Sequence, residues 1–406
     1  MIPKQSVLLF LNQRNKKHFM KKFLTVFLAA ILMITVKTNA QADSVAYTIR
    51  GNLSGVKKPV TKVLLTYING TKRSSDSSVI QHNEFSFSGY VYEPVVGTLT
   101  FRIDTNQFKQ LFPGKPVVAA ETKSIVLDKG AKTIQCLDSF TLSRIKGSHN
   151  QRDFDKLTQA LAPVFDTITK LGIKSAEAVK QGKREEQFRY LQLAREFTQK
   201  SNDIYLDFIK KNPDHDLANY YLGLYAGINF EESKLRPVFD QLSPRVKNFI
   251  SAKTFAGRMQ LLAAVNIGNS FPDSVQSDIN NQPLSISKLK GKTVLVCYWG
   301  AFMPHAIDQL NTFNDGSAKW RDNGFEILGI GLTFDSASHA TWKKTVTEKG
   351  WKGYHMTDKK GFANSLMRPL GLTAVPYFIV VDKAGKIISR NFSYDVILKY
   401  LKYYFK

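Results

Sequence analysis

An unbroken apolar run leads directly into a helix signal in Thr293-Val-Leu-Val-Cys-Tyr-Trp-Gly-Ala-Phe-Met-Pro-His-Ala-Ile-Asp-Gln-Leu310. The run Val294–Trp299 is typical of a strand that is covered on both faces of a sheet. Pro304 suits the first turn of the helix that follows, because the amide hydrogen it lacks has no partner there. Functional sites commonly lie at such a strand-to-helix junction.

This segment resembles the active-site segment of thioredoxin-fold thiol–disulfide oxidoreductases of the TlpA-like and AhpC/TSA group, in which a strand, Phe-Trp-Ala-x-Trp-Cys-x-x-Cys and a helix follow one another. When the two are aligned on Trp299 and Pro304, the attacking cysteine falls on Met303 and the resolving cysteine on Ala306. A thioether cannot supply a thiolate, and a methyl group cannot resolve a mixed disulfide. The resemblance implies the thioredoxin fold, whereas these two residues argue against the usual reaction.

The resemblance extends to the end of the chain. Phe325–Leu332 predicts a second buried strand, a helix is expected around 337–348, and 371–388 predicts two strands joined by a tight turn. Val375-Pro376 stands where the family has a cis-proline, and there the residue before the proline offers backbone hydrogen bonds to an extended peptide. Alternatively, Pro376 only shapes the loop beneath Met303.

A peptide-binding surface at this site is the expectation that follows from the resemblance. The residues assigned to it are Trp299, Phe302, Met303, Pro304, His305, Val375 and Pro376. The only nearby thiol, Cys297, lies within the predicted strand and not at the helix start, where the dipole lowers a thiol pKa, so we expect it to be buried and inert.

A soft copper(I) site formed by Met303, His305 and Cys297 is a further alternative, because thioether, imidazole and thiolate suit that ion. Met303 and His305 are only two residues apart, however, and the spacing identifies no convincing third ligand. We therefore expect His305 to be a surface histidine and predict no metal and no cofactor.

The N-terminal 40 residues have the pattern of a secretory signal. Lys21 and Lys22 precede an apolar segment, 23–36, and small residues follow up to Ala40, after which we expect cleavage. A retained membrane anchor is the alternative, although the apolar segment is short for a span and no other segment approaches the required length. No lipobox cysteine follows. The sequence predicts export to the periplasm or cell envelope.

The chain is strongly basic, with a formal net charge of +24 over 406 residues. Removing residues 1–40, which carry seven Lys or Arg and no acid, leaves +17. The remaining lysines are scattered, which is typical of a solvated basic surface, and anionic envelope glycans or lipids are the alternative partners. Nucleic acid is not an expected partner, because the chain carries an export signal and no recognition motif.

The length and composition predict two or three modules. Residues 41–150 show short alternating strands, such as Glu84–Ser88, which predict a β-sandwich-like module. This part resembles a domain of unknown function that precedes thioredoxin domains in secreted Bacteroidetes proteins. The matching motifs are Ile49-Arg-Gly51, Ser75-Asp76-Ser77, Ser88-Gly89 and Lys146-Gly147-Ser148.

Helical periodicity predicts a connector over 151–266, and 267–406 then forms the thioredoxin-like domain, with a last helix at Tyr394–Phe405. The stripe Tyr220, Tyr221, Tyr225 admits a ligand groove, but helix packing is the expected role. Cys136 and Cys297, the only cysteines, fall in different modules, so no disulfide between them is expected.

These observations predict an exported, non-catalytic protein that binds or scaffolds another polypeptide of the cell envelope. The alternative, implied by the family resemblance, is a thiol–disulfide oxidoreductase or antioxidant protein, which would need Cys297 to be exposed or a partner to supply thiols. A copper-binding module is the third hypothesis.

Overall fold

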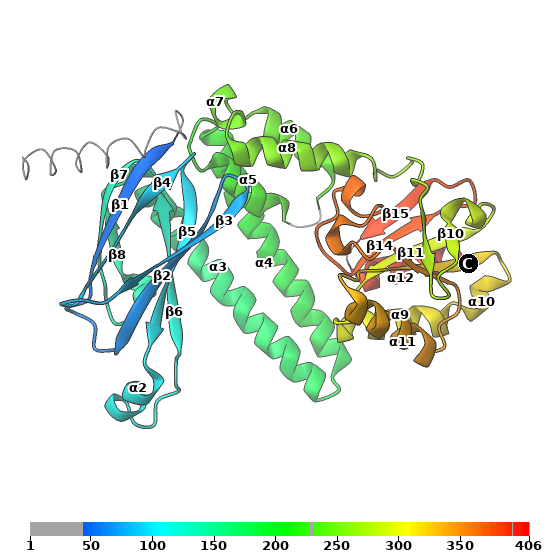
Figure 1. Ribbon diagram of the computed structural model, residues 1–406, viewed down its shortest axis with the longest axis horizontal. Coiled ribbons are helices and arrows are strands. Elements are labelled where there is room, and N and C mark those ends of the chain that lie inside the picture. The colour runs from blue at the N-terminus through cyan, green and yellow to red at the C-terminus, as the bar shows by residue number, and fades with distance from the viewer. Residues whose placement is uncertain (1–43, 228–229, 392, 406) are drawn as a thin grey trace, which may run out of the picture.

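The computed structural model describes residues 44–227, 230–391 and 393–405. The predicted signal segment and its cleavage site lie outside the described residues. Figure 1 shows three parts along the longest axis, with a β-rich part at one end, helices in the middle and a second sheet at the other end. Within the described residues, no helix combines the length and the apolar character needed to cross a bilayer.

The N-terminal part is a sandwich of two four-stranded sheets, with strand orders β4-β1-β7-β8 and β3-β2-β5-β6. The strands are β1 (Val45–Asn52), β2 (Val60–Asn69), β3 (Lys72–Val79), β4 (Glu84–Val91), β5 (Val95–Ile103), β6 (Ala120–Leu127), β7 (Gly130–Gln135) and β8 (Arg144–Lys146). Phe85 and Phe87 point into the core while Ser86 and Ser88 are exposed, as their alternation predicts. Helix α2 (Thr105–Leu111), which the sequence did not predict, begins where the Asp104 carboxylate accepts two backbone amides.

Six helices form the middle of the chain. They are α3 (His149–Lys180), α4 (Arg184–Lys211), α5 (Ala218–Ala226), α6 (Glu232–Asp240), α7 (Pro244–Lys247) and α8 (Ile250–Ala263). On α5, Tyr221 is buried and stacks on Tyr205 of α4, with ring centroids 5.9 Å apart, and Tyr220 and Tyr225 pack against the same core. The tyrosine stripe therefore serves helix packing and does not line a ligand groove.

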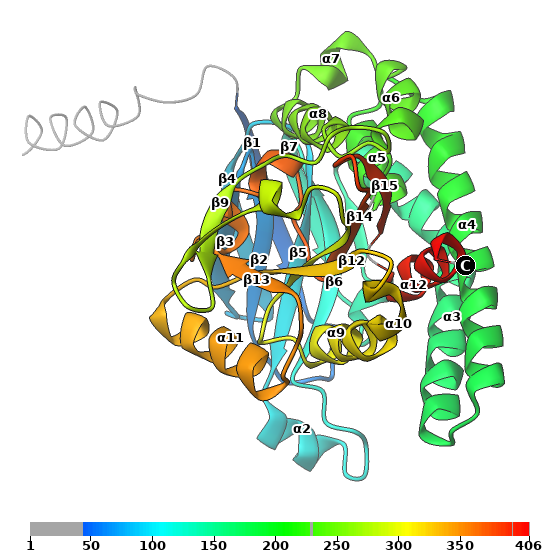
Figure 2. The ribbon, with the colours of Figure 1, turned by 90° about the vertical axis from the view of Figure 1, so that its right-hand side faces the viewer.

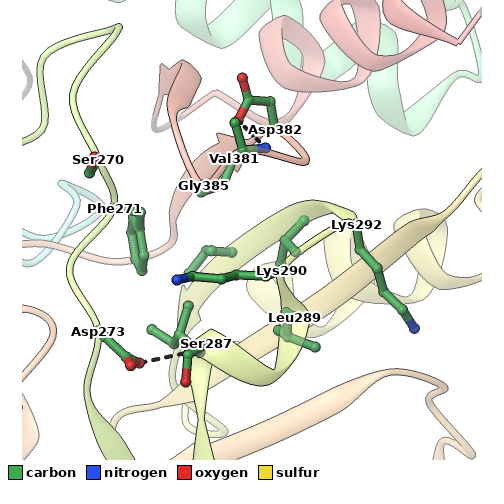
Figure 3. Close-up of a pocket in the computed structure, with 14 residues that line it drawn as sticks. Ser270, Phe271, Asp273, Ser287, Leu289, Lys290, Lys292, Val381, Asp382 and Gly385 are labelled. Carbon is green, nitrogen blue, oxygen red and sulfur yellow. Dashed lines mark hydrogen bonds between the residues drawn. The ribbon is translucent and has the colours of Figure 1, made fainter.

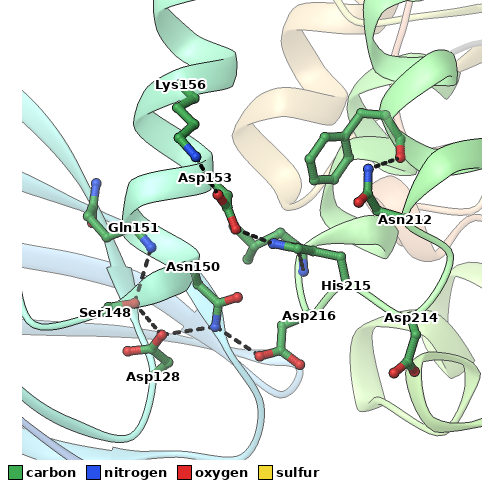
Figure 4. A network of polar contacts seen from close by, with 12 residues as sticks. Asp128, Ser148, Asn150, Gln151, Asp153, Lys156, Asn212, Asp214, His215 and Asp216 are labelled. Carbon is green, nitrogen blue, oxygen red and sulfur yellow. Dashed lines mark hydrogen bonds and ion pairs between the residues drawn. The ribbon is translucent and has the colours of Figure 1, made fainter.

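A buried aspartate joins the sandwich to α3, the first of the middle helices (Figure 4). Asp128 forms an ion pair of 2.5 Å with Lys132, accepts a hydrogen bond from the Ser148 hydroxyl at 2.5 Å and accepts another from the Asn150 amide at 2.9 Å. Asn150 also donates to Asp216, just before α5, at 2.8 Å. Because a buried charge is costly unless it is paired and hydrogen-bonded, these partners fix how α3 leaves the sandwich.

The C-terminal part contains one seven-stranded mixed sheet, ordered β10-β9-β13-β12-β11-β14-β15. Its strands are β9 (Val275–Asp278), β10 (Pro283–Ser285), β11 (Thr293–Trp299), β12 (Phe325–Gly331), β13 (Tyr354–Thr357), β14 (Tyr377–Val381) and β15 (Ile387–Asn391). Its helices are α9 (Pro304–Gly316), α10 (Ala318–Arg321), α11 (Ser336–Glu348) and α12 (Tyr394–Tyr404). Strands β11, β12 and β13 are parallel, and β14 is antiparallel to β11. The predicted α/β thioredoxin fold, preceded by a β-sandwich-like module and helices, is confirmed.

The two faces of this sheet are covered by different parts of the chain. Leu295 and Cys297 of β11 pack in one core with residues of α9, α11 and α12. Val296 and Tyr298 belong to a second core, which also contains residues of α8 and of the short 3-10 helix η4 (Arg368–Leu370). Figure 2 shows α9 and α11 below strands β12 and β13 and α8 above them. The middle helices and the C-terminal sheet therefore share one hydrophobic core.

Helix α8 connects the sandwich to the C-terminal sheet. At its start, the buried Glu93 carboxylate, from the turn between β4 and β5, accepts the backbone amides of Ile250 at 2.5 Å and Ser251 at 3.1 Å. Towards its other end, Leu261 and Leu262 lie against Gly371, where an added Cβ would be 3.1 to 3.2 Å from their side chains. A carboxylate at a helix N-terminus is favoured both by the amides and by the helix dipole.

Replacing Glu93 with Ala should lower the free energy of unfolding by about 2 kcal/mol, because the first amides of α8 lose a buried charged acceptor. Urea denaturation measures this change. Glu196→Ala, at an exposed position of α4, is the matched control and should change stability by less than about 0.5 kcal/mol. Equal effects of the two substitutions would contradict the role given to Glu93.

Candidate functional site

The candidate site lies where β11 ends and α9 begins. All seven residues of β11 are buried, since β12 and β14 pair with it on both sides and side chains cover both faces. The chain turns after Trp299, and Met303 is the N-cap residue of α9, with its carbonyl accepting the amides of Ala306 at 3.0 Å and Ile307 at 3.2 Å. Pro304 occupies the first turn, as predicted.

The two positions that carry sulfur in the resembled family hold no ionisable group here. Met303 is half-buried at the helix N-terminus, and Ala306 is fully buried. The positive end of a helix dipole stabilises a thiolate, but a thioether has no proton to lose and gains nothing from it. The helix start keeps its geometry while the nucleophile and the resolving thiol are both missing.

Pro376 lies at the same edge of the sheet as this helix start. Strands β11 and β14 pair in a register that sets Tyr298 opposite Tyr377, so Pro376 is one step beyond, at the level of Trp299. The Val375–Pro376 peptide bond is cis, and both residues are half-buried. Since neighbouring strands are about 4.8 Å apart, this turn and the end of β11 border one another.

Trp299 does not form part of the surface, which corrects its assignment to the binding residues. Its side chain has no exposed area and packs edge-to-face on Trp351, with ring centroids 5.0 Å apart. The alternating geometry of a strand turns Trp299 to the same face as Cys297, which is the face covered by helices. Trp299 supports the site from below.

His305 is exposed, as predicted, and its Nε2 lies 2.8 Å from the amide nitrogen of Gln309, one turn further along α9. Cys297 is buried in the core beneath, so the three ligands of the copper hypothesis do not share one surface. Within the described residues, no group of three or more His, Cys, Asp or Glu is arranged to hold a metal ion.

Both cysteines are buried, free thiols. Burial raises the pKa of the Cys297 thiol well above its ordinary value. In the sandwich core, burial raises the pKa of Cys136 to about 12, although a hydrogen bond with Ser143 opposes the shift. Reactive cysteines need a lowered pKa and access to solvent, and neither residue has them. Of the two conditions for the oxidoreductase hypothesis, an exposed Cys297 is therefore not met, and a partner that supplies thiols is not tested by these residues.

A buried histidine lies two strands from Cys297 in the same row of the sheet. The register places Cys297 beside Gly329, and Gly329 beside His355 of β13. Gly329 makes room for the imidazole, because a Cβ there would be 2.5 Å from His355 Nδ1. His355 stacks on Trp351, and neither ring nitrogen has a hydrogen-bond partner among the described residues. Burial lowers the pKa of His355 to about 4.

Three exposed phenylalanines surround the candidate site, and we call them the aromatic rim. Phe302 follows β11, Phe334 follows β12, and Phe362 lies in the 3-10 helix η3 (Gly361–Ala363) after β13. Their exposed fractions are 57%, 51% and 45%. The ring centroids of Phe302 and Phe334 are 6.1 Å apart, and those of Phe334 and Phe362 are 6.0 Å apart. The rings therefore form one connected apolar surface.

Two glycines allow the rim to form. A Cβ at Gly300 would be 2.3 Å from the ring of Phe302, and a Cβ at Gly361 would be 2.3 Å from the ring of Phe334. Gly361 also has a φ of 53°, a conformation that side chains disfavour. The sequence assigned only Phe302 to the site. Phe334 and Phe362 were missed, although both directly follow parallel strands, whose carboxyl ends meet at one edge of a sheet.

Comparison with known families agrees with this architecture. Residues 266–396 match the family model described as Redoxin. Residues 47–154 match the family model described as Domain of unknown function (DUF4369). A region that matches the Redoxin model and has a thioredoxin-like fold thus follows a region that matches the DUF4369 model. The two cysteines of the chain lie in separate cores and are unpaired.

Individual relatives resemble the C-terminal part. Thiol-disulfide oxidoreductase ResA of Bacillus thuringiensis is 26% identical over 126 residues, which are 31% of this chain and 69% of that protein. The thioredoxin domain of a thiol-disulfide oxidoreductase from Bacteroides vulgatus is 21% identical, with a TM-score of 0.32, over 35% of this chain and 99% of that structure. A thiol-disulfide oxidoreductase from Bacteroides fragilis is 18% identical, with a TM-score of 0.31, over 34% and 99%.

The native protein should not react with Ellman's reagent, because both thiols are buried and protonated. After complete denaturation, both thiols of the sequence should be exposed and should react with the reagent. Met303→Cys provides the matched control, since it puts a thiol at the half-buried start of α9, where the dipole favours the thiolate, and this variant should react with the native fold. Rapid labelling of the unmodified native protein would contradict the burial of Cys297.

The buried His355 should make the protein less stable in mild acid. Its pKa is about 4 in the fold and about 6.5 in the unfolded chain, so only the unfolded chain takes up a proton between these values. The free energy of unfolding is then highest above about pH 6.5 and falls by about 3 kcal/mol as the pH approaches 4.

Urea denaturation at several pH values measures this slope. His355→Leu should flatten it, because the substituted side chain cannot take up a proton. His305→Gln changes an exposed histidine in the same domain and should leave the slope as it is. An unchanged slope in His355→Leu would show that other groups cause the acid sensitivity.

Proposed function

We propose that this protein is exported to the cell envelope and there binds another polypeptide at the aromatic rim and the neighbouring Val375–Pro376 turn, without thiol chemistry. One observation carries the proposal. The two positions where the resembled enzymes hold their sulfurs are Met303 and Ala306, whereas the surface beside them is exposed and apolar. Such a surface suits binding and cannot exchange disulfides.

The geometry of the rim supports polypeptide binding. Exposed aromatic side chains in contact with one another form the kind of apolar patch that marks interaction sites on soluble proteins. Aromatic residues also supply much of the binding energy at protein interfaces. The half-buried Val375 precedes Pro376 at the edge of this surface and can offer backbone groups to an extended chain.

Export is supported by the sequence pattern of residues 20–40, in which basic, apolar and small residues follow one another. A partner of the envelope follows from that location. The formal charge of +17 after residue 40 favours an acidic partner over a basic one.

The proposal does not include the thiol–disulfide oxidoreductase activity that is named for the relatives. Thiol–disulfide exchange requires an attacking thiolate and a resolving thiol, and the two thiols of this chain are buried in separate cores.

The native protein should therefore fail to accelerate the reduction of insulin with dithiothreitol as the electron donor. The double variant Met303→Cys/Ala306→Cys restores the spacing of the two cysteines and should gain activity. Activity of the unmodified protein that Cys297→Ser abolishes would make Cys297 catalytic.

Binding is tested by selecting a library of random peptides of about twelve residues on the mature protein. We expect enriched peptides with apolar and acidic residues, and their affinity should fall at least tenfold for Phe302→Ser/Phe334→Ser, because the rim loses most of its apolar area. Val275→Ser removes a similarly exposed apolar side chain from β9 and is the matched control.

If the peptides bind Val275→Ser and the rim variant equally well, the aromatic rim is not the binding surface. A selection that enriches no peptide on the unmodified protein would overturn polypeptide binding at this surface.

A further inference from the structure

A cavity opens at the other end of β11, away from the candidate site. It has a volume of about 250 Å3 and is lined by residues of the segment before β9, the 3-10 helix η2 (Ile286–Leu289), β11 and the turn between β14 and β15. Val294 and Val296 line it, whereas the candidate site follows Trp299 at the opposite end of the same strand. The two sites therefore lie at opposite ends of β11. Figure 3 shows the residues that line the cavity.

The floor of this cavity is apolar. Its buried members are Phe271, Leu289, Val294, Val296 and Val381, all less than 9% exposed. The cavity is open to solvent at its mouth, so a ligand can reach this floor from outside. A dry apolar cavity of about 150 Å3 already accommodates benzene, and this one has room for a somewhat larger hydrocarbon group.

The carboxylates at the mouth are satisfied by neighbouring groups. Asp273 accepts hydrogen bonds from the Ser285 hydroxyl at 3.0 Å and from the Ser287 amide at 3.2 Å. Asp382 accepts the backbone amides of Ala384 at 2.9 Å and Lys386 at 2.8 Å, which is how it closes its turn. Neither carboxylate needs a cation from a ligand.

One exposed lysine at the mouth is free of protein partners within the described residues. Lys292 pairs with Glu326 at 2.9 Å. Lys290, by contrast, has neither an ion pair nor a side-chain hydrogen bond within the described part of the chain, and Figure 3 shows its side chain extended towards Phe271. The cavity thus combines an apolar floor with one ammonium group that has no direct partner among the described residues, although the Asp273 and Asp382 carboxylates also line the mouth.

We propose that this cavity binds a small amphipathic carboxylate, with its hydrocarbon part on the valine and phenylalanine floor and its carboxylate on Lys290. Burial of apolar carbons supplies affinity at about 0.8 kcal/mol for each methylene, and the charge pair fixes the orientation. An ammonium on a flexible stem suits a single carboxylate, since it acts as a point charge. This site is independent of the polypeptide site and does not rest on it.

Isothermal titration of the mature protein with octanoate, butanoate and uncharged octanamide tests the proposal. Octanoate should bind with one site per chain. Butanoate should bind at least tenfold more weakly because it buries fewer methylenes, and octanamide at least tenfold more weakly because it lacks the charge.

Three variants locate the site. Lys290→Gln should weaken octanoate at least tenfold and leave octanamide unchanged, whereas Lys288→Gln, an exposed lysine on η2 outside the cavity lining, should change neither. Ala384→Leu, at an exposed position of the mouth, should weaken both ligands by filling the entrance.

Binding of octanoate that Lys290→Gln and Ala384→Leu leave unchanged would overturn the proposal, and so would the absence of any heat up to about 10 mM octanoate. Unchanged urea midpoints of the three variants would show that their effects arise at the cavity and not from unfolding.

Discussion

The architecture depends on one constraint, which is that strand β11 is apolar on both faces and must be covered on both. Helices α9, α11 and α12 cover the face of Leu295 and Cys297. The face of Val296 and Tyr298 is closed by α8 and η4, which draws the middle helices into the core of the C-terminal sheet. Glu93 of the sandwich binds the start of α8, and α8 packs on the C-terminal sheet. The three parts of the chain are therefore in continuous contact. The position of the candidate site is thus set by residues far from it in the chain.

In this protein the thioredoxin-like scaffold is separated from the chemistry usually associated with it. The helix N-terminus, the adjacent cis Val375–Pro376 turn and the buried tryptophan beneath them are all present, while Met303 and Ala306 stand where the resembled family has its two cysteines. The same edge also carries exposed aromatic surface, for which two glycines leave room because they have no side chain. Fold and reaction rest on different residues, so the loss of one leaves the other intact.

Much of the fold could be predicted from the sequence because many of its helices and strands have a recognisable pattern of apolar and polar residues. The apolar run before Pro304, the alternation at Phe85 and Phe87 and the periodic helices all correspond to observed elements. Strand β3 (Lys72–Val79) escaped prediction because its residues are almost entirely polar, and it is a strand only because β2 pairs with it. The burial of Trp299 and the contact between Gly329 and His355 also depend on strand register, which a single sequence does not reveal. The cavity at Lys290 joins segments about 100 residues apart and has no local signal.

The shared core has a consequence for dividing the chain. A fragment that starts at residue 267 would keep every strand of the seven-stranded sheet but would lose Met259, Leu262 and Val265 of the second core. The rest of that core would then lose the cover that these three residues provide, and hydrophobic surface exposed in this way promotes association. The smallest unit that carries the candidate site in a closed core therefore begins before α8, within the helical part of the chain, and not at the border of the Redoxin match.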